Sequence, residues 1–514
     1  TIKATYYRIA LDLVESYNND AIINGLRYDR HNEIQAIELF AENIMDAGGH
    51  FLDKPMDSPF MPSWKRVLSA IPDIYDKLID AVQEDAMEFG SPKVVNPAMH
   101  PSALRLRQRI EQHIEEIYGP EQVQDLTDRL LEIAQLKGYA ISPTGGKNQW
   151  DERDIIAITY GDTIMKEGEL PLKTLQRFLA RELRNVVSGI HILPFFPYSS
   201  DDGFAIKDYH EVNPDLGTWE DVEAIGSDFR LMSDLVLNHC SSESEWFKNY
   251  LNDQSPGRGY FIEIAEDDDL SSVVRPRSTP LRTKVQTVNG EREVWCTFGP
   301  DQVDLNFSNP EVLFEIIKII RHHLRRGIRL FRLDAVAFIW KEAGTSCVHL
   351  KQTHEIVKLL RLILENLASD TVIITETNVP NRENLSYFGN ENEAHMIYNF
   401  SLPPLLVDAF LTGDCSHLKT WMMSMPPARQ GRTYFNFIAS HDGIGVRPTE
   451  GLLSPSQITE MLEELVSYGG QVSSRKLGDG KEDPYEVNIS LFDAFKGTIR
   501  GGVDNYQEKR FICA

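Results

Sequence analysis

The chain has 514 residues, of which 42% are apolar, enough to build a barrel-sized domain with additions. Its net charge of -25, from 52 basic and 77 acidic residues, argues against nucleic acids and anionic membranes as partners. No apolar run reaches the about 18 residues of a membrane span, and five scattered cysteines without a C-x-x-C pair favour a cytoplasmic protein with no metal site.

Residues 1–148 have the apolar spacing of helices and contain no catalytic motif. Apolar side chains recur every three or four positions in four segments: 33–44, 64–89, 102–118 and 121–137. Gly119-Pro120 joins the last two segments. We interpret residues 1–148 as an N-terminal helical extension with a packing or assembly role. A homodimer is a separate hypothesis for the whole protein.

From about residue 149, short apolar runs alternate with helix-like stretches, which is typical of buried parallel strands joined by helices. Seven runs predict strands: 155–160, 190–196, 231–237, 328–333, 372–375, 396–400 and 434–439. The pattern predicts an α/β fold with most of a (β/α)8 TIM barrel, and a doubly wound sheet is the alternative. We find no eighth strand and expect it to be missing from this chain.

Two long stretches rich in glycine and charge, 241–306 and 443–505, break the alternation. They follow the third and seventh predicted strands, so they should lie at the carboxyl end of the sheet, where active-site loops gather. We therefore expect inserted subdomains there. The barrel would comprise 149–240 and 307–442, and 506–514 would begin its next helix.

Polar residues follow four of the predicted strands. They are Asp234, Asn238 and His239 after the third, Arg332 and Asp334 after the fourth, Glu376 after the fifth, and His441 and Asp442 after the seventh. A charged side chain next to a buried run must pair or face the barrel mouth. Asp234 could serve either as support or as a direct contact.

Retaining glycoside chemistry needs such a set: a nucleophilic carboxylate and an acid/base carboxyl about 5–5.5 Å apart. An arginine two residues before the nucleophile points to the same side of a strand and keeps the carboxylate ionised. A third carboxylate can stabilise the oxocarbenium charge of the transition state.

These clusters resemble, in order, the four signature regions of the α-amylase superfamily, and 302–306 (QVDLN) resembles its fifth. The segment from Gly203-Phe204 to Gly217-Thr218 is similar to the one after that family's second strand. The resemblance implies that Asp334 is the nucleophile, Glu376 the acid/base and Asp442 the transition-state stabiliser. It also implies that the glucosyl subsite is lined by His239, Arg332 and His441.

A narrower resemblance links 195–204 to the sucrose-phosphorylase branch. It implies that Asp201 holds glucosyl hydroxyls and that Phe204 stacks on the sugar. Arg275-Pro276-Arg277 is similar to the phosphate-side loop of that branch, where an arginine pair could clamp phosphate bidentately. Without the family context, the same residues would predict a solvated basic turn.

The segment 483–488 falls where the branch carries its mobile acceptor loop. The remaining residues expected to bind substrate are Phe298, Phe338, Tyr485 and Glu486. The sucrose enzymes usually have a glutamine at the place of Glu486 and a tyrosine at that of Phe338. The N-terminal extension resembles relatives that act on glucosylglycerol or glucosylglycerate, and we expect the family's C-terminal β domain to be missing here.

The resemblance implies a glycosyltransferase: a retaining α-glucoside phosphorylase that uses phosphate and releases α-glucose 1-phosphate without a cofactor or metal. An ionised Glu486 accepts hydrogen bonds from a polyol but repels a carboxylate unless a cation such as Arg475, Lys476 or Lys481 intervenes. We therefore expect glucosylglycerol as the favoured substrate, then glucosylglycerate or sucrose. A sucrose hydrolase, an amylosucrase-like transglucosidase and an inactive binding or assembly protein are the alternatives.

Overall fold

The computed structural model describes residues 101–136, 149–277, 279–429, 431–476 and 482–514. They belong to one of the two units of the chain, His100–Ala514; the other is Thr1–Met99. The helices predicted at 33–44 and 64–89 lie outside the described residues.

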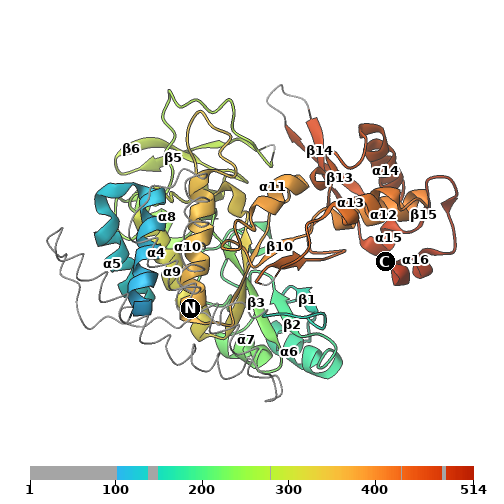
Figure 1. Ribbon diagram of the computed structural model, residues 1–514, viewed down its shortest axis with the longest axis horizontal. Helices are drawn as coiled ribbons and strands as arrows, with labels where there is room; N and C mark the ends of the chain where they lie inside the picture. The colour runs from blue at the N-terminus through green and yellow to red at the C-terminus, as the bar shows by residue number, and fades with distance from the viewer. Residues whose placement is uncertain (1–100, 137–148, 278, 430, 477–481) are drawn as a thin grey trace, which may run out of the picture. The chain divides into compact units, whose positions relative to one another are not determined.

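A curled sheet of seven parallel strands forms the centre of this unit (Figure 1). In order across the sheet, they are β1 (Ile156–Thr159), β2 (Gly189–Ile192), β3 (Arg230–Val236), β8 (Ile328–Asp334), β9 (Val372–Thr375), β10 (Met396–Tyr398) and β11 (Thr433–Phe435). Each is one of the seven predicted strands. Neighbours in the sheet follow one another along the chain without the reversal of a doubly wound sheet, so the barrel prediction is confirmed.

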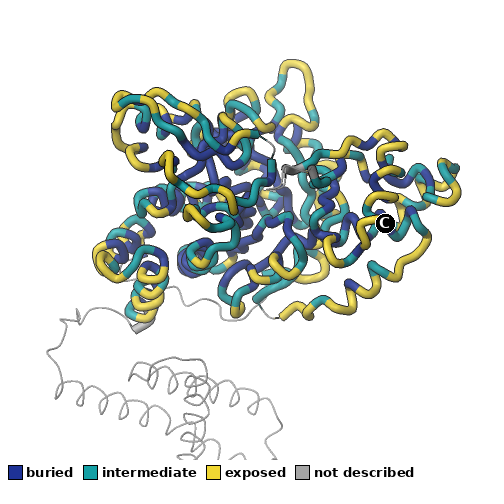
Figure 2. The backbone as a smooth tube through the Cα atoms, turned by 90° about the horizontal axis from the view of Figure 1, so that it is seen from above, coloured by how far each residue is buried: buried dark blue, intermediate teal, exposed yellow. Residues whose placement is uncertain are grey.

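Helices connect the strands and cover the sheet: α6 (Pro171–Glu182), α7 (Trp219–Gly226), α9 (Pro310–Arg325), α10 (Lys351–Leu367), α11 (Asn381–Ser386), α12 (Leu402–Thr412) and α13 (Ser416–Ser424). In α9, Asn309 caps the N-terminus by accepting the N–H of Glu311, Pro310 takes the first turn, and the apolar face is buried. Figure 2 shows the buried residues concentrated towards the middle of the unit.

The predicted pair of helices before the barrel is also present. It consists of α4 (Pro101–Tyr118) and α5 (Val123–Ala134), joined by the short turn η1 (Pro120–Gln122). α4 packs on α10, where His113 Nδ1 lies 2.8 Å from Glu355 Oε2, and α5 packs on α9, where Arg129 pairs with Glu311. Both helices thus belong to the outer layer of the barrel.

The first inserted stretch contains regular structure. It holds α8 (Glu245–Leu251), a hairpin of β5 (Arg282–Thr287) and β6 (Gly290–Trp295), and β7 (Gln302–Asp304). β7 pairs antiparallel with β4 (His239–Ser241), which continues directly from the end of β3. This pairing ties the inserted stretch to the carboxyl end of the sheet.

The second inserted stretch has its own small core, which includes Met461, Leu465, Val487 and Phe495. Its elements are β12 (Ile444–Gly445), η4 (Arg447–Thr449), α14 (Pro455–Ser467), β13 (Gln471–Lys476), β14 (Glu482–Asn488), α15 (Leu491–Ala494), β15 (Gly497–Thr498) and β16 (Gly502–Val503). The segment expected as an acceptor loop forms β14, because its backbone pairs with β12 on one side and β13 on the other. α16 (Gln507–Cys513) follows, with Phe511 packed against Phe492.

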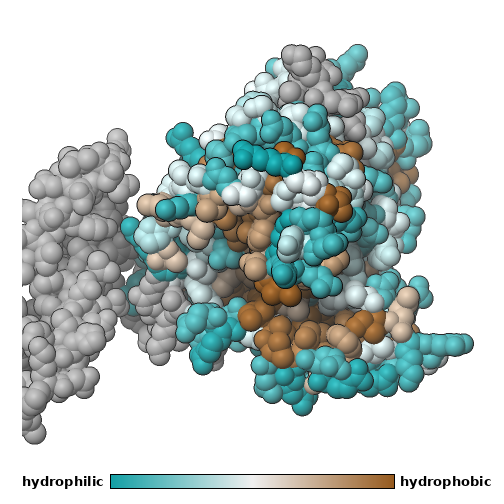
Figure 3. All heavy atoms as spheres, turned by 90° about the vertical axis from the view of Figure 1, so that its right-hand side faces the viewer, coloured by the Kyte–Doolittle hydropathy of each residue, from teal (hydrophilic) through white to brown (hydrophobic). Residues whose placement is uncertain are grey.

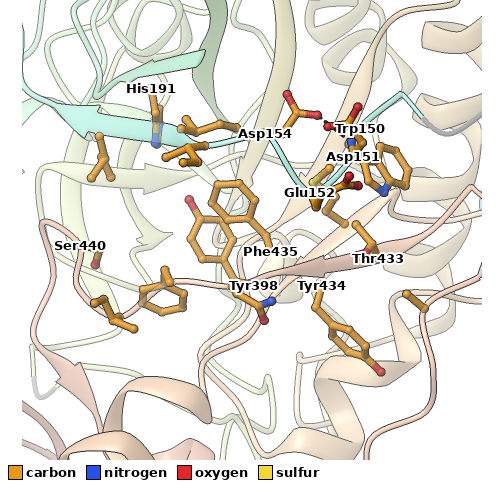
Figure 4. A pocket seen from close by; sticks show the side chains of 18 of the residues that line it. Trp150, Asp151, Glu152, Asp154, His191, Tyr398, Thr433, Tyr434, Phe435 and Ser440 are labelled. Carbon is orange, nitrogen blue, oxygen red and sulfur yellow. Dashed lines mark hydrogen bonds between the residues drawn. The ribbon is translucent and has the colours of Figure 1, made fainter. Parts of the chain in front are cut away.

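β1 and β11 are the outer strands of the sheet, and no described strand pairs with their free edges. A cavity of about 1230 Å³ lies against both of them, lined among others by Ile156, Ile158, Phe435 and Phe437 (Figure 4). The side of the unit that carries the second inserted stretch has apolar side chains gathered around a hollow (Figure 3). No described helix is long and apolar enough to cross a membrane.

Candidate active site

The predicted catalytic residues meet in a pocket of about 160 Å³ at the carboxyl end of the sheet. Every predicted site residue except Arg275 lines it: Asp201, Phe204, His239, Arg277, Phe298, Arg332, Asp334, Phe338, Glu376, His441, Asp442, Tyr485 and Glu486. The sheet, both inserted stretches and the loop after β2 therefore all contribute to one site.

Asp334 is the last residue of β8 and is held by Arg332 of the same strand. Arg332 Nη1 donates to Asp334 Oδ1 at 2.7 Å and to Asp234 Oδ1 at 2.5 Å. Directly after the strand, Ala335 adopts a left-handed conformation (φ 48), and its N–H donates to Glu376 Oε2 at 3.1 Å. One short segment of backbone thus links the predicted nucleophile to the predicted acid/base.

The two carboxyls accept hydrogen bonds from different donors. Burial raises the pKa of both Asp334 and Glu376, Arg332 lowers both, and neighbouring carboxylates raise them again. Asp334 accepts a hydrogen bond from the charged Arg332, whereas the hydrogen bond that Glu376 accepts comes from a neutral backbone N–H. Burial raises the pKa of Asp334 to about 8, and the charged donor Arg332 is the contact that favours its carboxylate form.

Asp442 follows β11 and is more open to solvent, with 46% of its side chain exposed. The neighbouring His441 stacks almost parallel on Phe204, with ring centroids 5.4 Å apart. Burial lowers the pKa of His441, so the imidazole is neutral at pH 7.

Asp201 and His239 of the predicted glucosyl subsite are joined by Gln302. Gln302 Nε2 donates to Asp201 Oδ2 at 2.7 Å and lies 3.0 Å from His239 Nε2. Burial lowers the pKa of His239, so its Nε2 can accept the second amide proton. Asp201 sits in a left-handed conformation (φ 56) in η2 (Asp201–Gly203), and Gln302 holds this strained loop at the pocket.

The remaining wall is aromatic on one side and charged on the other. Phe298 packs edge-on against Phe338, with centroids 5.7 Å apart. Arg277 and Glu486, which have opposite charges, both line the pocket, and Glu486 belongs to β14. Burial and then Asp442 raise the pKa of Glu486, while Arg277 lowers it.

Two predicted features lie away from the pocket. Arg275 does not line it, and its Nε and Nη2 are buried without a hydrogen-bond partner among the described residues. Asp234 is fully buried beneath the pocket, where it bonds His191 and Arg332. Of the two roles left open for Asp234, the geometry matches support.

The sequence profile of the α-amylase catalytic domain matches residues 184–445. Over 410 residues the chain is 47% identical to a glucosylglycerate phosphorylase of Allomeiothermus silvanus, an alignment that covers 80% of this chain and 73% of that protein. The chain belongs to the α-amylase family.

Within the α-amylase family, two further proteins point to the same branch. The chain is 29% identical to a glucosylglycerol phosphorylase of Marinobacter adhaerens, over 63% of this chain and 68% of that one. A sucrose 6F-phosphate phosphorylase from Thermoanaerobacter thermosaccharolyticum has a similar structure, with a TM-score of 0.60 and 25% identity over 67% of this chain and 72% of that one. The resemblance to the sucrose-phosphorylase branch is therefore confirmed.

Among the pocket-lining residues to which the sequence analysis gave no role are Tyr160, Gln302 and Asn378. Tyr160 directly follows β1 and meets the edge of His441, with centroids 6.2 Å apart. Gln302 begins the QVDLN motif, and Asn378 lies two residues after Glu376. Asn378 Oδ1 is buried with no hydrogen-bond partner among the described residues. Because all three follow or begin strands, position at a strand end was the signal that could have found them.

A metal centre was not predicted, and the described residues contain no group of three or more His, Cys, Asp or Glu placed to hold a metal ion.

Proposed function

We propose that the protein is a retaining α-glucoside phosphorylase, which transfers a glucosyl unit from a small α-glucoside to phosphate and releases α-glucose 1-phosphate. The observation that carries this proposal is Arg277, which lines the pocket of the catalytic carboxylates. No described carboxylate lies within ion-pair distance of its guanidinium. A fixed cation in this pocket serves a phosphate acceptor, whereas a hydrolase that uses water has no need for one.

The geometry supports a two-step reaction. In the first step the Asp334 carboxylate attacks the anomeric carbon, the glycosidic C–O bond breaks, and the proton of Glu376 passes to the leaving oxygen. In the second step a phosphate oxygen attacks the same carbon, its proton returns to Glu376, and the bond to Asp334 breaks. Two inversions give net retention, and Asp442 stabilises the positive charge that develops on the sugar in both.

For the acceptor side we propose glucosylglycerate as the favoured substrate and glucosylglycerol as the second. The sequence predicted the reverse order because an ionised Glu486 would repel a carboxylate. Burial raises the pKa of Glu486, which favours its neutral form, and Arg277 lines the same pocket as a cation; each weakens the repulsion of a carboxylate acceptor. The unpartnered Asn378 Oδ1 can accept a hydrogen bond from an acceptor hydroxyl. The side chains of Arg475, Lys476 and Lys481, the cations first considered, lie outside the described residues.

The acceptor order can be measured in the direction of synthesis. Starting from α-glucose 1-phosphate, D-glycerate, glycerol and fructose are offered separately, and kcat/KM is determined for each. We expect D-glycerate to give the highest value, since it alone places an anion near Arg277. A higher value for glycerol would restore the order predicted from the sequence, and a preference for fructose would contradict both and indicate a sucrose phosphorylase.

Arg277→Ala is expected to raise the KM for phosphate by about 10- to 150-fold, because a charge-assisted hydrogen bond contributes about 1.5–3 kcal/mol. The KM for glucosylglycerol, which carries no anion, should rise less. Initial rates at varied phosphate measure both. Arg292→Ala, on the hairpin strand β6, removes an arginine that lies 3.4 Å from Glu263 and serves as the matched control.

The same experiment with Arg275→Ala tests the predicted arginine clamp. If both substitutions weaken phosphate binding equally, the two arginines act as a pair. An unchanged phosphate KM in Arg277→Ala would mean that the Arg275-Pro-Arg277 turn has no role in phosphate binding, and the phosphorylase proposal would lose its main support.

A further inference from the structure

Beneath the pocket, a chain of three hydrogen bonds leads from a buried histidine to the nucleophile. His191 Nε2 lies 2.9 Å from Asp234 Oδ2, Asp234 Oδ1 accepts from Arg332 Nη1 at 2.5 Å, and Arg332 Nη1 also donates to Asp334 Oδ1 at 2.7 Å. His191, Asp234 and Arg332 are almost completely buried. The residues come from three adjacent strands, β2, β3 and β8.

Asp234 is the centre of this chain. Burial raises its pKa, but His191 and Arg332 outweigh burial and hold the pKa below the usual range, so the group is a carboxylate. A carboxylate only accepts hydrogen bonds, and the proton between the two side chains therefore lies on His191 Nε2. Each of the two oxygens of Asp234 thus has one donor: His191 for Oδ2 and Arg332 for Oδ1.

The guanidinium of Arg332 depends on this carboxylate for its position. Both of its hydrogen bonds to described residues leave from Nη1, and its Nε is buried without a partner among them. The two aspartates therefore share one nitrogen of the arginine. If Asp234 lost the His191 donor, its charge would be less neutralised, and it would draw Arg332 away from Asp334. Asp334 would then be more easily protonated, since burial and Glu376 already favour its neutral form.

We propose that His191 is a positioning residue for the nucleophile: by donating to Asp234, it fixes the carboxylate that holds Arg332 against Asp334. The role of Asp334 as nucleophile rests on the proposed function. Figure 4 shows the His191 side chain projecting from its strand at the wall of the cavity between the outer strands of the sheet. It touches neither the sugar pocket nor the phosphate side, so its effect on the reaction passes through Asp234 and Arg332.

The test compares His191→Phe, which has no donor, with His191→Gln, which keeps one. In the full-length enzyme, His191→Phe should lower kcat/KM by about 10- to 100-fold, the usual effect of removing a charge-assisted hydrogen bond. His191→Gln should recover most of that loss. The loss should be equal for the natural donor and for α-glucosyl fluoride, because the nucleophile and not the acid/base is affected, and the phosphate KM should stay unchanged.

His323→Phe is the matched control. His323 on α9 is also fully buried, and its Nε2 lies 2.9 Å from the carbonyl oxygen of Tyr209, away from the pocket. The His323→Phe substitution should lower Tm but leave kcat/KM within about threefold of the wild type, since His323 has no contact with the reacting groups. Thermal unfolding of all three variants separates a loss of fold from a loss of rate.

Three outcomes would overturn the proposal: a His191→Phe enzyme within about twofold of wild-type kcat/KM, a His191→Gln enzyme as slow as His191→Phe, or a loss confined to phosphate binding. The glucosyl fluoride assay follows transfer to any acceptor, water included. It therefore tests the role of His191 independently of the acceptor. If phosphate proves not to be the acceptor, the proposed function fails but the inference about His191 can still hold.

Discussion

Asp334→Asn is expected to reduce glucosyl transfer by at least about 10⁴-fold with every donor, because the variant has no group that can form the covalent intermediate. The asparagine oxygen can still accept the hydrogen bond of Arg332, so binding and fold should be preserved. The measurement is the initial rate with glucosylglycerate and phosphate and, separately, with α-glucosyl fluoride. Loss with the fluoride donor is decisive, since that donor needs no acid catalysis.

Asp370→Asn provides the control for this substitution. Asp370 also pairs with an arginine, Arg329, at 3.1 Å, but it is exposed and lies outside the pocket. Its activity should match that of the wild type. If Asp334→Asn keeps more than about 1% of the activity, and Asp334→Ala does too, the assignment of the nucleophile is wrong.

Glu376→Gln is expected to slow the reaction of unactivated glucosides by about 10²- to 10⁴-fold, while α-glucosyl fluoride loses far less. The reason is that an alkoxide leaving group requires a proton, which Glu376 can supply because burial raises its pKa, whereas fluoride leaves without one. Rates for the formation of glucosyl-enzyme with the two donors give the ratio directly.

An equal loss on both donors would show that Glu376 does not act as the acid. Glu383→Gln is a suitable comparison, because Glu383 bonds His349 at the surface and its removal leaves the pocket intact. The ratio of the rates with the two donors also distinguishes Glu376→Gln from His191→Phe. For His191→Phe we expect the same loss of rate with both donors.

The fold was predictable where apolar runs mark buried strands, and less so in the inserted stretches. All seven strands of the sheet were found in this way. The β5–β6 hairpin was missed although Asn289-Gly290, where the turn meets β6, is a strong turn signal. β14 was expected as a loop. It pairs with β13 (471–476), which precedes it closely in the sequence, and with 444–445, which is distant in the sequence and is brought to it only by the tertiary fold.

The site was predictable for a related reason: the carboxyl ends of neighbouring strands meet at one edge of a parallel sheet. Asp334, Glu376 and Asp442 follow this rule. The arginine pair does not, because two residues spaced by two share a side only in a regular extended strand, and Arg275 and Arg277 lie in an irregular loop. The hydrogen bond between His191 and Asp234 joins two strands, and no local pattern announces it.

The residues of the pocket come from two kinds of element. Asp334, Glu376 and their arginine stand on or directly after sheet strands, whereas Arg277, Phe298 and Glu486 stand on the two inserted stretches. Substitutions in the insertions can therefore change the acceptor while the groups that make and break the glucosyl bond stay in place. We therefore expect acceptor choice and glucosyl transfer to be separable by substitution at pocket-lining positions of the insertions other than Arg277. A directed-evolution library confined to the pocket-lining positions of 275–298 and 482–488 should accordingly contain many active variants with altered acceptor choice.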